Sequence, residues 1–187
     1  VSSNIGMAKI GKKLERQRYY RYLSDFGFGR RTGIDFPGEA KGILRSPEQW
    51  FEADLAAISF GQGITVTALQ LARATAAIAN GGLMMEADLV RRVVDHEGRT
   101  VEKHKPVTAR RVLPEAVAGA VRDMMVRVVS EDGTGPLAQV PGFSVAGKTG
   151  TAQKVDPVTG GYSADKRVSS FVGFLPARRL PQIVREF

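Results

Sequence analysis

The stretch GKTGTAQ, residues 147–153, places one lysine and two threonines on what the sequence predicts to be a β-strand. Lysine commonly marks the edge of a sheet, and glycine weakens a strand. One interpretation is that Lys148 only protects an exposed edge from pairing with another chain. The other is that a substrate lies along this edge, beside Lys148, Thr149 and Thr151. In that case Gly150, which has no side chain, lets the substrate approach the strand backbone closely and pair with it as an added strand.

The beginning of the sequence carries a second polar group, Ser2, Ser3 and Asn4. Apolar side chains follow at helical spacing, so these residues are well suited to cap a helix that begins just after them. The only reason to assign these three residues a chemical role is the presence of the Lys-Thr-Gly stretch far along the sequence. Both interpretations remain open on the residues alone.

The sequence contains few residues that could support thiolate, histidine-based or metal-dependent chemistry. It contains no cysteine, which excludes a disulfide, a thiolate nucleophile and a cysteine-ligated zinc. The two histidines, His96 and His104, lie in a polar stretch that is typical of a surface loop. We therefore expect no histidine-based triad, no metal site and no cofactor.

The composition is that of a globular protein, with 43% hydrophobic and 25% charged residues in a chain of 187. The net charge of +8 is compatible with a nucleic-acid binder. The basic residues, however, come in scattered short groups without a stacking-aromatic pattern beside them, so we expect no nucleic-acid partner. No apolar run of about 18 residues occurs, and we expect any membrane anchor to lie outside this sequence.

Hydrophobic spacing and turn residues predict the elements that must position these groups. We expect helices at residues 5–14, 65–80 and 114–130, a hairpin at 89–103, and long strands at 143–153 and 168–177. The two long strands should pair as an antiparallel hairpin across a polar connection, residues 154–168. The glycine-rich segment 24–45 is predicted to be a loop.

A few residues are expected to pack or to shape turns. We interpret Trp50 and Phe51 as packing anchors. Gly61 and Gly63 are expected to serve turn geometry. The expected core fillers are the methionines Met84, Met85, Met124 and Met125.

Two short motifs and four longer segments carry a resemblance to a known family. Residues 2–4 match a Ser-x-Asn motif of penicillin-binding proteins, and residues 148–151 match their Lys-Thr-Gly motif. The longer segments are FGFGRRTGIDFPGEAKGIL, ISFGQGITVTALQLARATAAIANGG, VPGFSVAGKTGTAQ and SSFVGFLPA. Over about residues 1–176, the chain resembles the transpeptidase domain of a class B, cell-division type penicillin-binding protein.

This resemblance implies an α+β fold, the penicillin-binding protein and serine β-lactamase-like transpeptidase fold. In that fold a five-stranded antiparallel sheet is flanked by helices, and the active site lies between the sheet edge and a helical subdomain. The resemblance also implies serine-type D,D-transpeptidase activity, in which a serine attacks a D-Ala-D-Ala stem peptide or a β-lactam.

The same resemblance implies catalytic roles for Ser2, Asn4 and Lys148. The Ser2 hydroxyl would pass a proton to the leaving amine, and the Asn4 amide would orient the lysine and the substrate. Lys148 would contribute positive potential. Thr149 and Thr151 would bind the substrate carboxylate, and the backbone N–H of Thr151 would be one donor of the oxyanion hole.

The match departs from the family pattern at both ends. In the family, the nucleophile belongs to a Ser-x-x-Lys motif that lies well before Ser-x-Asn. The one such string in this sequence, residues 163–166, falls in the turn-rich connection, and we expect it to have no catalytic role. Residues 180–187 offer only a short strand in place of the family's last strand and terminal helix. We therefore expect residues 1–187 to be a partial transpeptidase domain, without the upstream Ser-x-x-Lys segment and the C-terminal helix.

The leading interpretation is that the chain is a portion of a peptidoglycan D,D-transpeptidase for septal cell-wall synthesis, inactive alone because it lacks the nucleophile. The alternative is a non-catalytic platform or sensor of the same fold in a division complex. The expected partners are the D-Ala-D-Ala stem peptide, β-lactam antibiotics and division-complex proteins. The expected location is the cytoplasmic (inner) membrane, with this domain on the periplasmic or extracytoplasmic side.

Overall fold

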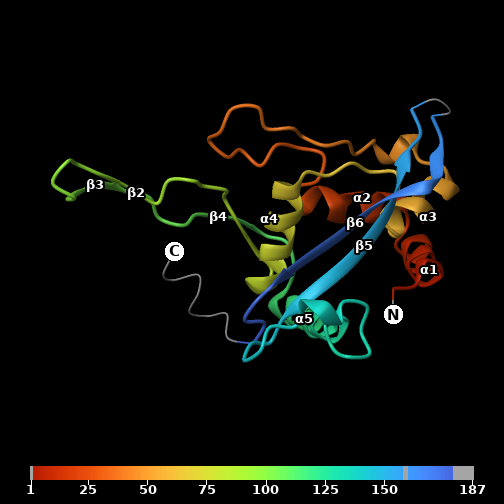
Figure 1. Cartoon of the computed structure of the whole chain (residues 1–187). Helices are drawn as coiled ribbons and strands as arrows, with labels where there is room; N and C mark the ends of the chain where they lie inside the picture. Colours follow the sequence, from red (N-terminus) through yellow and green to blue (C-terminus); the bar gives the residue numbers. More distant parts are fainter. Residues whose placement is uncertain (1, 158–159, 179–187) are drawn as a thin grey trace.

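The computed structural model describes residues 2–157 and 160–178. A long twisted hairpin of strands β5 and β6 runs across the molecule, and helices lie along it (Figure 1). The helices are α1 (Asn4–Leu14), α2 (Arg16–Asp25), α3 (Glu52–Ser59), α4 (Ala68–Ala79) and α5 (Glu115–Val128), with short 3₁₀ turns η1 (Pro47–Gln49) and η2 (Pro136–Ala138). The strands are β1 (Leu83–Met85), β2 (Arg92–Val94), β3 (Thr100–Lys103), β4 (Thr108–Arg111), β5 (Ala146–Val155) and β6 (Tyr162–Phe174).

The described strands form three antiparallel pairs, β1–β4, β2–β3 and β5–β6. The predicted hairpin at 89–103 is confirmed as β2–β3, which extends from the body of the molecule as a narrow arm (Figure 1). The fold class, helices with antiparallel sheet, is also confirmed. Within the described part of the chain, however, the main sheet contains two strands and not the five that the resemblance implied.

The pairing of β5 with β6 is confirmed, but the predicted connection between them is too long. The register runs from Ala146 opposite Phe174 to Val155 opposite Tyr162, with an irregularity after Gln153. Most of the residues that were assigned to the connection therefore lie in the two strands. Their backbone hydrogen bonds to the opposite strand outweigh the turn preference of the local sequence.

The three predicted helices are confirmed, and the hydrophobic core lies where two of them meet the hairpin. Helix α5 packs against β5, and α4 packs against β6 and α5. The core consists of Met125, Ala146 and Ala177, with Ile78, Val121, Val126 and Phe174 packed around them. The small residues of α4 allow this close approach, because the side chains of Ala74, Ala77 and Ala79 are buried.

The predicted core methionines are only partly correct. Met84 and Met125 are buried, as expected. Met124 is 65% exposed, because neighbouring residues on a helix point about 100° apart and Met125 already faces the core. Met85 is partly exposed at the end of a short strand.

Helices α2 and α3 were not predicted, and the segment between them contains both expected aromatic anchors. Trp50 is buried, with its indole N–H donating to the Arg45 carbonyl oxygen at 3.1 Å. The prediction for Phe51 is wrong, because its side chain is 79% exposed. Phe51 caps α3 through its backbone N–H, which donates to Asp54 Oδ2 at 2.9 Å, so its position is fixed without burial of the ring.

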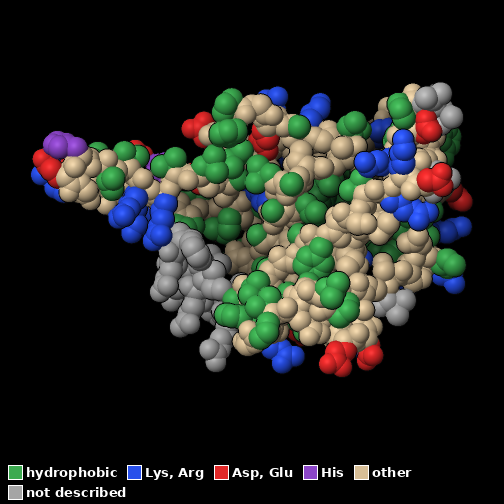
Figure 2. Space-filling model, in the orientation of Figure 1, with side chains coloured by type: hydrophobic (Ala, Val, Ile, Leu, Met, Phe, Trp, Pro, Cys, Tyr) green, Lys and Arg blue, Asp and Glu red, His purple; other side chains and the backbone are tan. Residues whose placement is uncertain are grey.

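The predicted loop 24–45 contains no regular helix or strand beyond the end of α2. The buried side chain of Gln70 on α4 fastens it, by donating to the carbonyl oxygens of Arg30 at 2.7 Å and Lys41 at 2.9 Å. On the surface, lysine and arginine side chains form separate groups and no continuous patch on the face shown in Figure 2. This distribution follows the scattered basic groups of the sequence.

Helix α1 lies directly on α3, and Gly11 makes this contact possible. Gly11 is buried, and a Cβ atom at this position would overlap Ser59 Oγ and lie 2.9 Å from Ser59 Cβ. Ser59 is itself buried on the facing side of α3. The separation of the two helices is therefore set by the absence of a side chain at Gly11.

Substitution of Gly11 by alanine should destabilise the protein. Overpacking costs about 1–3 kcal/mol, while alanine gains about 0.5–1 kcal/mol over glycine in a helix. Urea unfolding should therefore show a net loss of up to about 2.5 kcal/mol for Gly11→Ala. In the control Gly119→Ala on α5, the new Cβ meets only Arg122 Nη2 at 3.8 Å. That variant should gain stability, and equal stabilities of the two variants would contradict the packing of α1 on α3.

Candidate active site

The structure brings the beginning of the chain to the predicted substrate edge. Lys148 Nζ on β5 donates to Ser2 Oγ at 3.2 Å, although the two residues are 146 positions apart. It also donates to the carbonyl oxygen of Thr149 at 2.5 Å. A hydroxyl group and an ammonium group from two separate elements therefore meet at one point.

Helix α1 fixes the position of Ser2. Ser3 is its N-cap, and the Ser3 side chain accepts a hydrogen bond from the Gly6 backbone N–H at 3.1 Å. Ser2 consequently lies just before the helix N-terminus, where the helix dipole is positive and the first turn contains no acidic residue. The dipole and Lys148 together make this place favourable for an anion.

The charge of Lys148 is available to a ligand. The side chain is exposed, and no described carboxylate lies within ion-pair distance of it. A surface lysine that forms an ion pair with a neighbouring acidic side chain has its charge compensated, which is not the case for Lys148 among the residues that the structure describes. Lys148 therefore leaves a positive potential in front of β5.

Thr149 contacts a residue that the sequence analysis did not single out. The Thr149 and Thr134 hydroxyl oxygens are 2.8 Å apart. The loop after α5 places Thr134 there, and its Gly135 would carry a Cβ only 3.2 Å from Thr149 Cγ2. In the sequence, the segment EDGTG indicated only the end of a helix, so nothing in the local pattern pointed to this contact.

Gly150 has a packing role that the sequence analysis did not consider. It lies opposite Ser170 on β6, and a Cβ at Gly150 would be 2.6 Å from Ser170 Oγ. A larger residue at this position would require the Ser170 hydroxyl to rotate away. Close approach of a substrate at Gly150 stays a prediction. Thr151, opposite Ser169, is exposed.

Asn4 is the first residue of α1, and its side chain is exposed. Within residues 2–157 and 160–178, its carboxamide makes no hydrogen bond, neither to Lys148 nor to Ser2. The structure thus places Asn4 two residues after Ser2, at the start of α1. Its orienting role stays a prediction.

The edge of β5 that faces away from β6 has no partner strand in the described chain. Free backbone N–H and C=O groups on such an edge can pair with an extended peptide. Residues 148–151 belong to this edge. The site therefore offers a row of backbone groups next to a hydroxyl and a positive charge.

The Ser-x-x-Lys string at residues 163–166 is part of β6, whereas the sequence predicted a loop at this position. The Ser163 hydroxyl accepts hydrogen bonds from the backbone N–H groups of Asp165 at 3.3 Å and Lys166 at 3.0 Å. A serine nucleophile paired with lysine needs adjacent turns of a helix, so that both side chains lie on one face. Residues three apart on a strand point to opposite faces, which leaves this string without the required geometry.

His96 lies between β2 and β3, and His104 directly follows β3. The arm formed by these strands extends away from β5, the strand of Lys148 (Figure 1). His104 Nδ1 is 2.9 Å from Asp88 Oδ2, and His104 Nε2 is 3.1 Å from Glu102 Oε1. The hydrogen bond with Asp88 is the main reason that the pKa of His104 is raised above its ordinary value. His96 is exposed beside Glu97. In the described residues no group of three or more histidine or acidic side chains is arranged to hold a metal ion.

The comparisons with known proteins point to one family. Residues 1–185 match the family profile described as the penicillin binding protein transpeptidase domain. Stage V sporulation protein D of Bacillus subtilis (strain 168) is 39% identical over 177 residues, which are 94% of this chain and 27% of that protein. Peptidoglycan D,D-transpeptidase FtsI of Escherichia coli (strain K12) is 34% identical over 94% of this chain and 28% of its own length. The chain thus spans a little more than a quarter of these relatives.

Solved structures of similar fold belong to the same group of proteins. Penicillin binding protein 3 of Mycobacterium tuberculosis, complexed with aztreonam, superposes with a TM-score of 0.86 at 37% identity, covering 94% of this chain and 40% of that chain. The D,D-transpeptidase domain of a peptidoglycan glycosyltransferase from Eggerthella lenta has a TM-score of 0.81 at 31% identity, covering 95% and 44%. None of the described helices has the length and apolar character that a membrane crossing requires.

The pairing of His104 with Asp88 predicts a pH effect on the arm. The pKa of His104 is raised above its unfolded value of about 6.5. The resulting stabilisation is therefore fully present below that pH and is lost as the pH rises through the folded-state pKa. In Asp88→Asn, an NMR titration should show a lower His104 pKa than in the unchanged chain. Glu131→Gln, at an exposed position after α5, is the control, and an unchanged His104 pKa in Asp88→Asn would contradict the assignment.

Proposed function

Since this chain belongs to the penicillin-binding protein transpeptidase domain family, we propose that it is part of a peptidoglycan D,D-transpeptidase that cross-links stem peptides by serine acyl transfer. The observation that carries the proposal is the 3.2 Å contact between Lys148 Nζ and Ser2 Oγ. It joins the two motifs by which the sequence resembles the family. Residues 1–187 are then a portion of the transpeptidase domain of a longer parent protein.

In the proposed reaction, a serine oxygen bonds to the carbonyl carbon of the penultimate D-alanine, and the bond to the terminal D-alanine breaks. The departing amine must take up a proton. The nucleophilic serine gives its proton to the lysine amine of its own motif in the parent protein, and this lysine returns a proton through the Ser2 hydroxyl, which passes its own proton to the departing amine. The ammonium group of Lys148 stabilises the Ser2 oxygen during this relay. The amine of a second stem peptide then attacks the acyl-serine and loses a proton through the same relay to the serine oxygen, which completes the cross-link and releases the serine.

The nucleophilic serine is assigned to the parent protein. Ser163 lies on β6 with its hydroxyl bound to local backbone N–H groups, so we do not assign it this role. A Ser-x-x-Lys segment of the parent protein would have to lie beside Ser2 and Lys148. This chain alone is then expected to bind without acylation.

The substrate binds along the free edge of β5. Its terminal carboxylate is drawn to the uncompensated charge of Lys148 and accepts hydrogen bonds from the hydroxyls of Thr149 and Thr151. Thr134 holds the Thr149 hydroxyl in place, because the two oxygens are 2.8 Å apart. The backbone N–H of Thr151 serves as an oxyanion-hole donor, and loss of one such donor typically costs about 3 kcal/mol of barrier. Asn4 orients the peptide group of the substrate.

β-Lactams enter the same site as substitutes for the stem peptide. Structural neighbours are complexed with aztreonam and ampicillin, which supports this assignment. Because the substrate is cell-wall peptide, the domain works on the outer side of the cytoplasmic membrane, anchored through another part of the parent. Its role in septal synthesis implies partner proteins of the division complex.

Labelling with a fluorescent penicillin tests the proposed function. The 187-residue chain should remain unlabelled after denaturing electrophoresis, whereas the parent protein with its Ser-x-x-Lys segment should be labelled covalently. In the parent, Lys148→Met should slow acylation by about 10²–10³-fold, because charge stabilisation at the site is lost. Lys154→Met, at an exposed position further along β5, is the matched control and should acylate at the normal rate.

Two results would decide against this assignment. Labelling of Ser2 or Ser163 would show that the proposed roles are wrong. A parent protein that cannot be labelled at all would favour the non-catalytic platform or sensor over the enzyme.

A further inference from the structure

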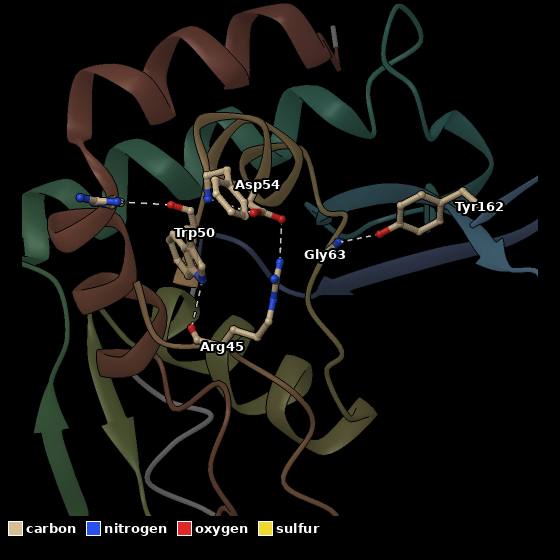
Figure 3. Close-up of polar contacts among 7 residues, drawn as sticks. Arg45, Trp50, Asp54, Gly63 and Tyr162 are labelled. Carbon is tan, nitrogen blue, oxygen red and sulfur yellow. Dashed lines mark hydrogen bonds and ion pairs between the residues drawn. The ribbon is translucent and has the colours of Figure 1, made fainter. Parts of the chain in front are cut away.

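Besides the contact between Lys148 and Ser2, a second hydrogen bond joins the hairpin to the helical part of the molecule, far from Lys148. The hydroxyl of Tyr162, the first residue of β6, accepts a hydrogen bond from the Gly63 backbone N–H at 3.0 Å (Figure 3). The two residues are 99 positions apart in the sequence. Tyr162 thereby connects the outer end of the β5–β6 hairpin with the loop between α3 and α4.

The loop on the Gly63 side packs against α3. Gly61 and Gly63 have positive φ angles of 94° and 74°, which confirms the turn geometry that the sequence predicted. A Cβ at Gly63 would lie 3.3 Å from Ile58 Cγ1 on α3, so the loop folds back tightly on that helix. The position of the Gly63 N–H is therefore determined by α3.

Helix α3 is in turn held firmly in the helical part of the molecule. Asp54 on α3 pairs with Arg45 at 2.6 Å, and the buried Trp50 donates to the Arg45 carbonyl oxygen (Figure 3). On its other side, α3 packs on α1 through Ser59 and Gly11. Gly63 is thus connected through packed elements to α1, the helix that presents Ser2.

Two hydrogen bonds therefore connect the β5–β6 hairpin with the helical part of the molecule, at different places along the hairpin. Ser2 meets Lys148 at one place, and Gly63 meets Tyr162 at the other. Tyr162 lies opposite Val155, seven residues beyond Lys148 on β5, which corresponds to about 20 Å along an extended strand. Packing on α4 and α5 holds the hairpin near Ala146 and Phe174, and the hydrogen bond from Gly63 attaches its other end, so that attachment at both ends fixes the angle of the hairpin. The substrate edge, residues 148–151, begins at the first of the two hydrogen bonds and runs toward the second.

We propose that Tyr162 is a positioning residue that holds the hairpin at a fixed angle and thereby sets the separation between the start of α1 and the substrate edge of β5. Its effect on catalysis rests on the proposed function. Tyr162 acts through the strand pairing and does not reach the reacting atoms. Loss of its hydroxyl lowers the fraction of molecules with the edge correctly placed, which weakens substrate binding in proportion.

The side chain contributes little to the fold itself. Tyr162 is 49% exposed, and in the described part of the chain its hydroxyl makes the single hydrogen bond to Gly63. Substitutions at such exposed positions usually change stability little. Tyr162→Phe keeps the ring and removes only the acceptor oxygen. The variant therefore separates positioning from folding.

Amide measurements on the 187-residue chain test the hydrogen bond between Gly63 and Tyr162 directly. In Tyr162→Phe, hydrogen exchange of the Gly63 amide should accelerate about three- to tenfold, and the NMR amide signals of residues 148–151 should shift, while the melting temperature stays the same. The matched control is Tyr22→Phe, at a 40% exposed position on α2. It should change none of these signals. Unchanged Gly63 exchange, or unmoved signals of residues 148–151, would overturn the proposal.

Acylation kinetics of the parent protein test the consequence. Tyr162→Phe should raise the dissociation constant for a penicillin about three- to fivefold and change the rate constant of acylation less than twofold, as expected for a residue that positions the edge. Equal losses in both constants, or no loss in either, would overturn the positioning role. Absence of acylation in the unchanged parent would contradict the proposed function, whereas the amide measurements test the hydrogen bond between Gly63 and Tyr162 independently of it.

Discussion

The hydrogen bond between Lys148 and Ser2 is the contact that the rest of this structure positions. A site for acyl transfer needs groups that approach the substrate from different directions, and in this chain one comes from a strand and the other from a helix start. Neither element can provide both. The packing of α1 on α3, the pairing of β5 with β6 and the packing of the hairpin on α4 and α5 all serve to keep these two groups together.

Glycine at a few positions makes these approaches possible. Gly11 lets α1 lie against Ser59, and Gly150 leaves room for the Ser170 hydroxyl on the opposite strand. At Gly147 a Cβ would overlap the ring of Phe171, so this ring covers the backbone of the opposite strand directly. Each of these glycines has a reason in packing, which is separate from any contact with a substrate. Flexibility of the chain is not required to explain them.

Much of this arrangement could be predicted from the sequence, and the failures have physical causes. The spacing of apolar residues was sufficient for α1, α4, α5 and the β5–β6 pair, because each has a strong period and clear caps or turns. Ser2 and Lys148, which the structure brings into contact, were singled out because each lies in a short motif of a known family, and their catalytic roles stay predictions. Thr134 and Tyr162 were missed, because their importance comes from contacts with residues distant in the sequence. Phe51 and Met124 were misassigned, since apolar character alone does not tell which side of a helix or cap faces the core.

A double-mutant cycle on the parent protein tests the central claim, that Ser2 and Lys148 act on the substrate as one unit. Acylation by a penicillin would be measured for Ser2→Ala, Lys148→Met and the combination. Groups that act together are strongly non-additive, so the double variant should be hardly slower than the slower single variant. If the two effects on the rate multiply in full, the hydroxyl and the ammonium group work independently, and their joint action on the substrate is contradicted.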